Sequence, residues 1–294
     1  MTEEDQPLPE KKVTPGNLLL AAAMVVVIQL FALTVTSQNL PIYNSVVGVT
    51  GPSYAPAGTS LAGSAINAAI LVAFAFVLTL LLVWLLRRKM VLSFKVLIFG
   101  SVAFSAFVLT MVTADVFAVD FLPPAFELPV AFGVPALVVA AIAYVIFVKN
   151  VPWLATAVLA FVGAEVGSFF AVTLSPWTAL ALPIAFSLYD IYAVFKGPLK
   201  ALIGTAPNIA LVGLSIKAGE FTIGLGDVVF YTLLPSLALF QFYSTFGLIP
   251  AVLTIVAINV GVVITLFLLS RKRLLPGLPI PMLLGVLVIA RYLI

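Results

Sequence analysis

Two aspartates, Asp190 and Asp227, each lie inside a stretch of sequence that otherwise has the character of a membrane span. An ionised carboxylate is among the costliest groups to place in lipid, so an acid at such a position is by default a candidate for function. The two acids flank one short loop, and both can therefore lie at the same depth. A pair of carboxylates at one depth is what acid–base catalysis by two aspartates requires.

The composition predicts the class of structure that must position these acids. Hydrophobic residues make up 63% of the 294 positions and charged residues only 9%, which is typical of a polytopic membrane protein. The apolar runs lack the period-two alternation of an outer-membrane barrel, whereas helices satisfy their own backbone hydrogen bonds in lipid. We predict an all-α protein with a polar cytoplasmic tail at residues 1–16 and one transmembrane domain at residues 17–294.

Nine apolar runs are long enough to be considered as transmembrane helices. The ninth barely reaches the ~17 residues that a span needs. No internal repeat or linker is visible, which favours a single domain. The predicted helices cover residues 18–36, 61–86, 90–114, 125–148, 153–174, 177–195, 224–246, 247–269 and 278–293.

Basic residues predict the orientation, because cytoplasmic loops retain Lys and Arg. Under the nine-helix assignment all Lys and Arg residues but two fall on one side, Lys95 lies one turn inside that side, and Arg291 lies opposite. This pattern places the N-terminus in the cytoplasm and the C-terminus outside. Since these cations are spread over separate loops, they do not indicate a nucleic-acid partner.

The chain contains no His and no Cys. Serine proteases that use a histidine base, zinc proteases of the H-E-x-x-H kind, cysteine nucleophiles and thiolate redox chemistry are thereby excluded. If the protein is a hydrolase, carboxylates must transfer the protons. Three acids are predicted to lie at depth: Asp190, Asp227 and Glu165.

The predicted depths of the two aspartates agree. Asp190 precedes Lys196 by six residues and Asp227 follows Glu220 by seven, which puts them about 9 and 10 Å below the same membrane surface. Glu165 lies near the middle of the fifth span among small residues that allow close helix packing. For Glu165 we favour a protonated or hydrogen-bonded acid that ties two helices together over direct chemistry.

A purely structural role for the aspartates is the simplest alternative, with Lys95 as the nearest cation in a span. The glycines on either side of Asp227 argue against it, because Gly224 and Gly226 stand where a helix former is expected. Glycine lets another backbone, such as that of a substrate strand, approach the carboxylate closely.

Three short motifs occur in a fixed order at the predicted helix boundaries, and together they resemble the presenilin and signal peptide peptidase family of intramembrane aspartyl proteases. The family pattern has alanine where this chain has Gly277. The short loop between the sixth and seventh helices and the lack of eukaryotic-type extensions suggest a prokaryotic, archaeal homologue in the plasma membrane. The motifs are Tyr189-Asp190, Gly224-Leu225-Gly226-Asp227-Val228-Val229-Phe230-Tyr231 and Leu275-Pro276-Gly277-Leu278-Pro279.

The resemblance implies an endopeptidase that cuts transmembrane segments of other proteins within the bilayer. Two close carboxylates share a proton; the ionised member takes a proton from water while the other hydrogen-bonds the peptide carbonyl. The resemblance implies no metal or organic cofactor. A homo-oligomer is compatible with the sequence, and no accessory subunit is evident. The implied catalytic residues are Asp190 and Asp227, and the implied substrate-binding or site-shaping residues are Tyr189, Gly224, Leu225, Gly226, Pro276, Gly277, Leu278 and Pro279.

Two further segments bear on substrate handling. Pro276 and Pro279 remove two backbone donors, which suits an irregular segment that lines a wet cavity. Residues 201–216 are expected either to offer a strand edge that captures an extended substrate or to form an amphipathic surface segment. The presenilin-like orientation implies substrates whose N-terminus lies outside.

The main alternative from another class is an ion-coupled transporter or cation leak channel that uses Asp190, Asp227 and Glu165. Its helices would be broken at prolines inside the spans. Against it, no repeat pair is visible and the two aspartates lie near one end rather than at the midplane. A prepilin-type peptidase shares a glycine–aspartate site but has no counterpart to the proline motif at the ninth helix.

Overall fold

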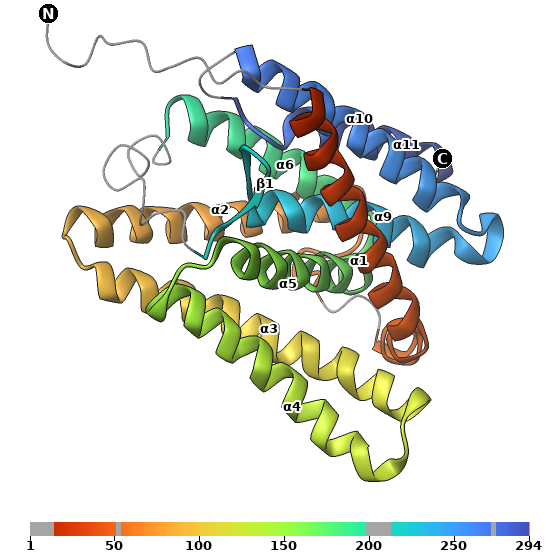
Figure 1. Ribbon diagram of the computed structural model, residues 1–294. Coiled ribbons are helices and arrows are strands. Elements are labelled where there is room, and N and C mark those ends of the chain that lie inside the picture. Colours follow the sequence, from red (N-terminus) through yellow and green to blue (C-terminus); the bar gives the residue numbers. More distant parts are fainter. Residues whose placement is uncertain (1–14, 51–53, 198–212, 272–274, 294) are drawn as a thin grey trace, which may run out of the picture.

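The computed structural model describes residues 15–50, 54–197, 213–271 and 275–293. Nearly all of this part of the chain is helical (Figure 1). The predicted tail lies outside the described residues except for Pro15 and Gly16. The helices are α1 Pro15–Thr50, α2 Leu61–Arg87, α3 Val91–Phe121, α4 Pro124–Ala143 with a π-helical turn Tyr144–Val148, α5 Pro152–Thr173, α6 Pro176–Phe195, α9 Leu225–Phe246, α10 Ile249–Arg271 and α11 Pro279–Leu293.

The polytopic all-α prediction is confirmed. Among the described residues, 8 helices are long and apolar enough to cross a membrane. The ninth, α11, has 15 residues, fewer than a full span needs. The predicted bounds lie close to the observed ones for most helices, but α3 continues to Phe121 and α1 continues to Thr50.

Local sequence explains where several helices begin. α4, α5 and α6 each start with proline in the first turn, a position whose N–H would have no helical partner. The side chains of Ser60 and Ser175 accept hydrogen bonds from the amides of Gly63 and Thr178 and so cap α2 and α6. The connections between consecutive helices from α2 to α6 are short, so these neighbours run in opposite directions.

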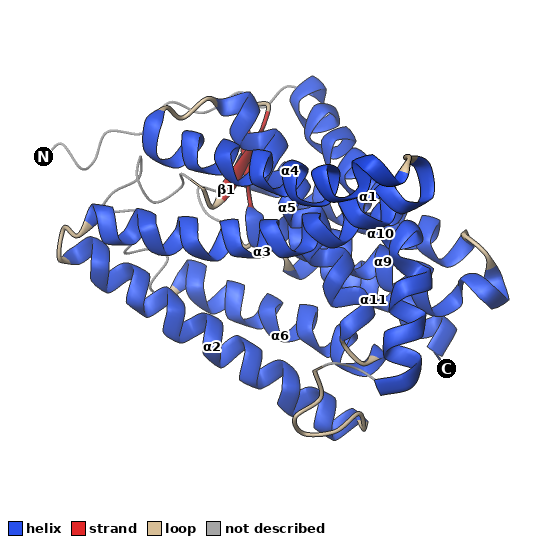
Figure 2. Cartoon of the chain, turned by 90° about the horizontal axis from the view of Figure 1, so that it is seen from below, coloured by secondary structure: helices blue, strands red, loops and turns tan. Residues whose placement is uncertain are grey.

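α9 forms the centre of the bundle and is the most buried of the candidate spans. It contacts α1, α5, α6, α10 and α11, while α3 and α4 form an outer pair and α2 packs on α6 (Figure 1, Figure 2). The α5–α9 contact is close because Gly167 has no side chain: a Cβ there would lie 2.6 Å from the carbonyl oxygen of Val229. Small residues allow such close contact between membrane helices.

A small antiparallel hairpin, β1 Ser215–Ala218 and β2 Phe221–Gly224, leads directly into α9. Its buried side chains alternate along each strand, and Gly219 has the positive φ that the tight turn requires. A strand edge or an amphipathic segment was predicted at residues 201–216. The first strand begins at Ser215, near the end of this range, and residues 201–212 lie outside the described part of the chain.

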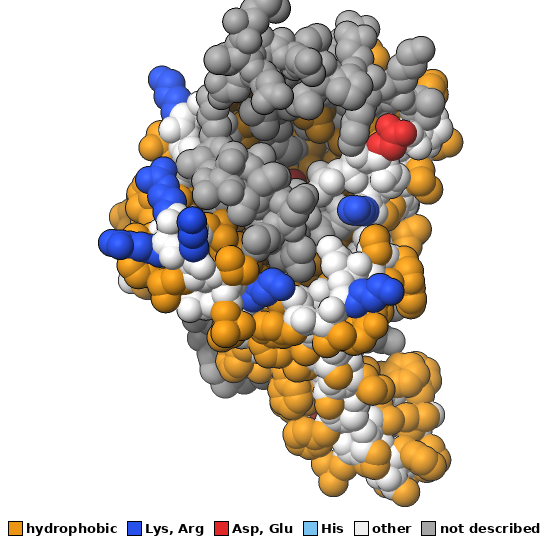
Figure 3. All heavy atoms as spheres, turned by 60° about the vertical axis from the view of Figure 1, so that its left-hand side comes forward, with side chains coloured by type: hydrophobic (Ala, Val, Ile, Leu, Met, Phe, Trp, Pro, Cys, Tyr) orange, Lys and Arg blue, Asp and Glu red, His pale blue; other side chains and the backbone are white. Residues whose placement is uncertain are grey.

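Lys and Arg side chains gather on one face of the molecule (Figure 3). Arg87 ends α2, and Arg88 and Lys89 lie between α2 and α3. Lys149 precedes α5, and Lys196 follows α6. Because consecutive helices run in opposite directions, these connections fall at the same end of the bundle. At the middle of the helices, large apolar side chains such as Phe104 and Leu137 are exposed, as expected for surfaces in contact with lipid.

Candidate active site

Asp190 lies in the last turns of α6 and faces the segment that precedes α11. Its Oδ2 accepts a hydrogen bond of 3.1 Å from the amide of Leu278, and the amide of Gly277 also interacts with this carboxylate. The segment is irregular at this point because Pro276 and Pro279 cannot donate to a helix. Its free amides are therefore available to the carboxylate.

Asp227 is the third residue of α9. Its Oδ2 accepts a hydrogen bond of 3.3 Å from the amide of Gly224, the residue that precedes the helix. An acid at this position satisfies one of the amides that a helix start leaves without a partner. The carboxylate is thus held where the hairpin joins α9.

The two carboxylates meet at Gly277. A Cβ added to Gly277 would lie 2.8 Å from Oδ2 of Asp227, whereas the next amide along the chain, that of Leu278, binds Asp190. The aspartates are close enough to interact electrostatically. Residues from three separate parts of the sequence therefore form one cluster, with one part from each of the three motifs.

Tyr231 completes this cluster from the next turn of α9. Its buried hydroxyl donates a hydrogen bond of 3.0 Å to the carbonyl of Gly277. Tyr231 follows Asp227 by four residues and so lies on the same face of the helix. Tyr231 belongs to the second of the three motifs, but no role was predicted for it; its spacing from Asp227 is the signal that could have revealed one.

The other residues predicted to shape the site are placed differently. The hydroxyl of Tyr189 donates to Oγ1 of Thr79 on α2 at 2.9 Å, so it is directed away from Gly277. The amide of Leu225 donates to the carbonyl of Leu214 at 2.8 Å. Gly226 is exposed, and a Cβ there would meet no described residue within 4 Å.

Glu165 is 2% exposed and ties α5 to α3, because its Oε2 accepts a hydrogen bond of 2.7 Å from Thr110. Its Oε1 has no hydrogen-bond partner among the described residues. Lys95, considered above as a cation partner for the aspartates, instead donates to the carbonyl of Ile146 at 3.1 Å.

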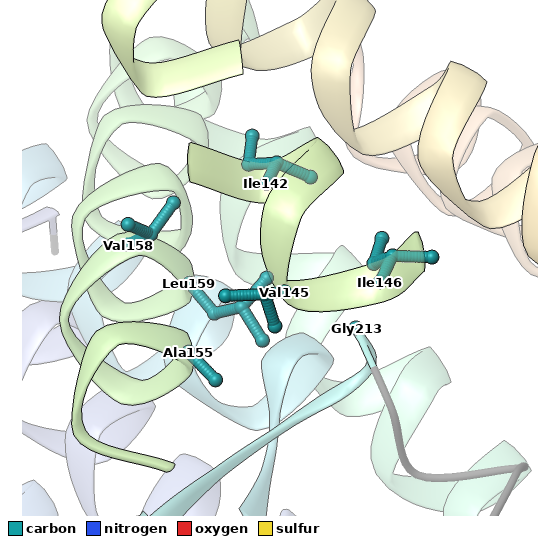
Figure 4. A pocket seen from close by; sticks show the side chains of 7 residues that line it. All are labelled: Ile142, Val145, Ile146, Ala155, Val158, Leu159 and Gly213. Atoms are coloured by element: carbon teal, nitrogen blue, oxygen red, sulfur yellow. The ribbon is translucent and has the colours of Figure 1, made fainter. Parts of the chain in front are cut away.

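A cavity of about 10 Å³ lies between the end of α4, α5 and the start of the hairpin (Figure 4). It is no larger than one water molecule requires, and its lining includes neither aspartate. Its apolar lining offers no group for acid–base chemistry. The lining residues are Ile142, Val145, Ile146, Ala155, Val158, Leu159 and Gly213.

The presenilin family model matches residues 16–210, which is more than half of the chain. The match includes Asp190, and Asp227 lies beyond it. A solved structure described as a presenilin family intramembrane aspartate protease is similar in fold, with a TM-score of 0.61 and 19% identity over 94% of this chain and 99% of that one. No curated protein matches the sequence. Because the family model covers more than half of the sequence, the chain belongs to the presenilin family.

Proposed function

We propose that this membrane protein is an intramembrane aspartyl protease in which Asp190 and Asp227 together activate water. The observation that carries the proposal is the convergence of the two carboxylates on the Gly277–Leu278 segment. The similar solved structure is described as an intramembrane aspartate protease, which supports the same activity.

The chemistry follows from two carboxylates that share one proton. The ionised carboxylate removes a proton from water as the water oxygen bonds to the peptide carbon, and the protonated carboxyl gives its proton to the carbonyl oxygen. The resulting gem-diol collapses when its C–N bond breaks. The leaving nitrogen receives the proton that came from water, and one gem-diol hydroxyl returns its proton to the other carboxylate as the new C=O bond forms. The pair then again holds one proton.

Substrate approaches the pair from the side of the hairpin. Oγ1 of Thr156 accepts from the amide of Lys217 at 3.1 Å, so this amide points away from β2. In an antiparallel pair the residue opposite, Thr222, must then direct its own amide and carbonyl away from β1. Thr222 is exposed, and an extended peptide can add a strand there.

The expected substrates are transmembrane segments within the bilayer, with their N-terminus outside. The expected setting is the plasma membrane, with the N-terminus of the protease in the cytoplasm. The position of both aspartates near one end of their helices favours proteolysis over ion transport through the midplane.

The test compares cleavage of a labelled transmembrane peptide by the purified protein with cleavage by Asp190→Asn and Asp227→Asn. Each variant is expected to lose activity by about 1,000-fold or more, since each carboxylate is needed for proton transfer. Asp115→Asn, an exposed position on α3, is the matched control and should cleave normally. Retained cleavage in either site variant would overturn the proposal, and liposome ion flux that these variants abolish would support the transporter instead.

A further inference from the structure

A pair of amide side chains, the buried Gln29 on α1 and the half-buried Asn259 on α10, lies against the central helix α9. Gln29 is 0% exposed, and its Nε2 donates a hydrogen bond of 3.0 Å to the carbonyl of Tyr231. Nδ2 of Asn259 donates to Oε1 of Gln29 at 2.6 Å and also to the carbonyl of Ile255 at 2.8 Å. Three helices are therefore joined through one side chain.

The carbonyl of Tyr231 is available to Gln29 because of Pro235. A carbonyl inside an α-helix normally accepts the amide hydrogen four residues later, and the residue four positions after Tyr231 is Pro235, which has none. A buried carbonyl without a partner is costly. The amide of Gln29 takes the place of the missing donor.

The same tyrosine contacts the candidate active site through its other end. Its hydroxyl donates to the carbonyl of Gly277 at 3.0 Å. Gly277 lies against Asp227, and the following amide, at Leu278, donates to Asp190. A continuous series of contacts thus runs from the amide pair to both carboxylates.

We propose that Gln29 and Asn259 are positioning residues for proteolysis: by holding the Tyr231 backbone they fix the tyrosine hydroxyl, and with it Gly277 and the spacing of the two carboxylates. The inference rests on the proposed function. Neither amide touches the substrate; both act through Tyr231.

The first test is Gln29→Leu, which removes the donor and keeps a side chain of similar size. Because the change acts on the geometry of the carboxylates and leaves the strand edge at Thr222 untouched, kcat should fall about tenfold while KM stays constant. Asn259→Leu leaves Gln29 in place but removes the hydrogen bond that Asn259 donates to Oε1 of Gln29. We expect kcat to fall about threefold in this variant.

Thr36→Val is the matched control on the same helix. It removes a buried hydrogen bond between α1 and Ser168 of α5 that has no connection to Tyr231. We expect its kcat to equal that of the parent even where its thermal stability is lower. A loss of kcat in Thr36→Val as large as in Gln29→Leu would show that any lost polar contact of α1 has this effect, and would overturn the inference.

A second test restores the missing donor within α9. Pro235→Ala gives residue 235 an amide hydrogen that can bind the Tyr231 carbonyl. In that background Gln29→Leu should change kcat by less than twofold, because the carbonyl no longer depends on Gln29. If Gln29 served only to fill the core, its loss would cost the same in both backgrounds, and that result would reject the inference.

The outcomes separate this inference from the function on which it rests. If the parent chain does not cleave, or if Asp227→Asn does, the proposed function fails. If the parent cleaves, Asp227→Asn does not and Gln29→Leu retains the parental kcat, only the positioning role fails. Should Gln29→Leu fail to fold, Asn259→Leu measured with and without Pro235→Ala gives the same comparison.

Discussion

Replacing Gly277 by alanine is expected to impair catalysis, although alanine is the residue of the family pattern. The new Cβ would lie 2.8 Å from Oδ2, 3.2 Å from Cγ and 3.3 Å from Oδ1 of Asp227. Ordinary contacts begin near 3.4 Å, so the carboxylate must move by 3.4 − 2.8 = 0.6 Å. A displacement of 1 Å in a catalytic group can cost about 100-fold, so kcat should fall about tenfold, or ~1.4 kcal/mol.

The same substitution should not lower stability. Gly277 is not among the glycines with a positive φ, so alanine fits the backbone without strain. Alanine also reduces the conformational entropy of the unfolded chain, which stabilises a protein by about 0.4–1 kcal/mol at a compatible position. The expected signature is therefore a lower kcat together with an unchanged or slightly higher Tm.

The assay is steady-state cleavage of a labelled transmembrane peptide, with Tm measured on the same preparation. Gly100→Ala is the matched control, because a Cβ there would meet nothing within 4 Å, and it should leave kcat unchanged. A Gly277→Ala protein with parental or higher kcat would refute the reasoning. It would mean that Asp227 does not need the space that glycine leaves.

Three other changes test separate contacts. Thr110→Val removes the hydrogen bond to Glu165 and should destabilise the protein by about 1–3 kcal/mol with little effect on kcat; unchanged thermal unfolding would contradict this. Gly167→Ala places a Cβ 2.6 Å from the carbonyl oxygen of Val229, so we expect a lower Tm, and an unaltered Tm would show that α5 and α9 can separate freely. Thr222→Pro removes the outward amide of β2 and should raise KM about fivefold through the loss of one hydrogen bond; a parental KM would argue against strand addition.

Much of the helical fold could be predicted because its signals are local. An apolar run of sufficient length predicts a span by itself, and an acid such as Asp190 within that run is conspicuous. The hairpin was not predicted as such, because strands of four residues within an apolar stretch are too short to distinguish from a loop by periodicity. Buried side chains alternate along both strands, with Ile216 opposite Ile223. This alternation can be recognised only when the register of the two strands is known.

The contacts that organise the site could not be predicted in the same way. Tyr231 and Gly277 are separated by 46 residues and Gln29 and Asn259 by 230, so no local pattern connects them. Periodicity identifies the face of a helix but not the neighbour that covers it. Gln29 nonetheless has a signal in the sequence, because a polar amide within an apolar span is itself unusual.

Gly224 is both the last residue of β2 and the residue that precedes α9. No linker separates the strand that would receive an extended peptide from the helix that carries Asp227. A peptide paired along β2 would therefore lie at a fixed distance from the carboxylate, and a shift of two residues in pairing would move its backbone by about 7 Å. The register of the substrate on β2 would therefore determine which peptide bond lies at the carboxylates and is cut. No pocket that recognises the side chains at that bond would be needed.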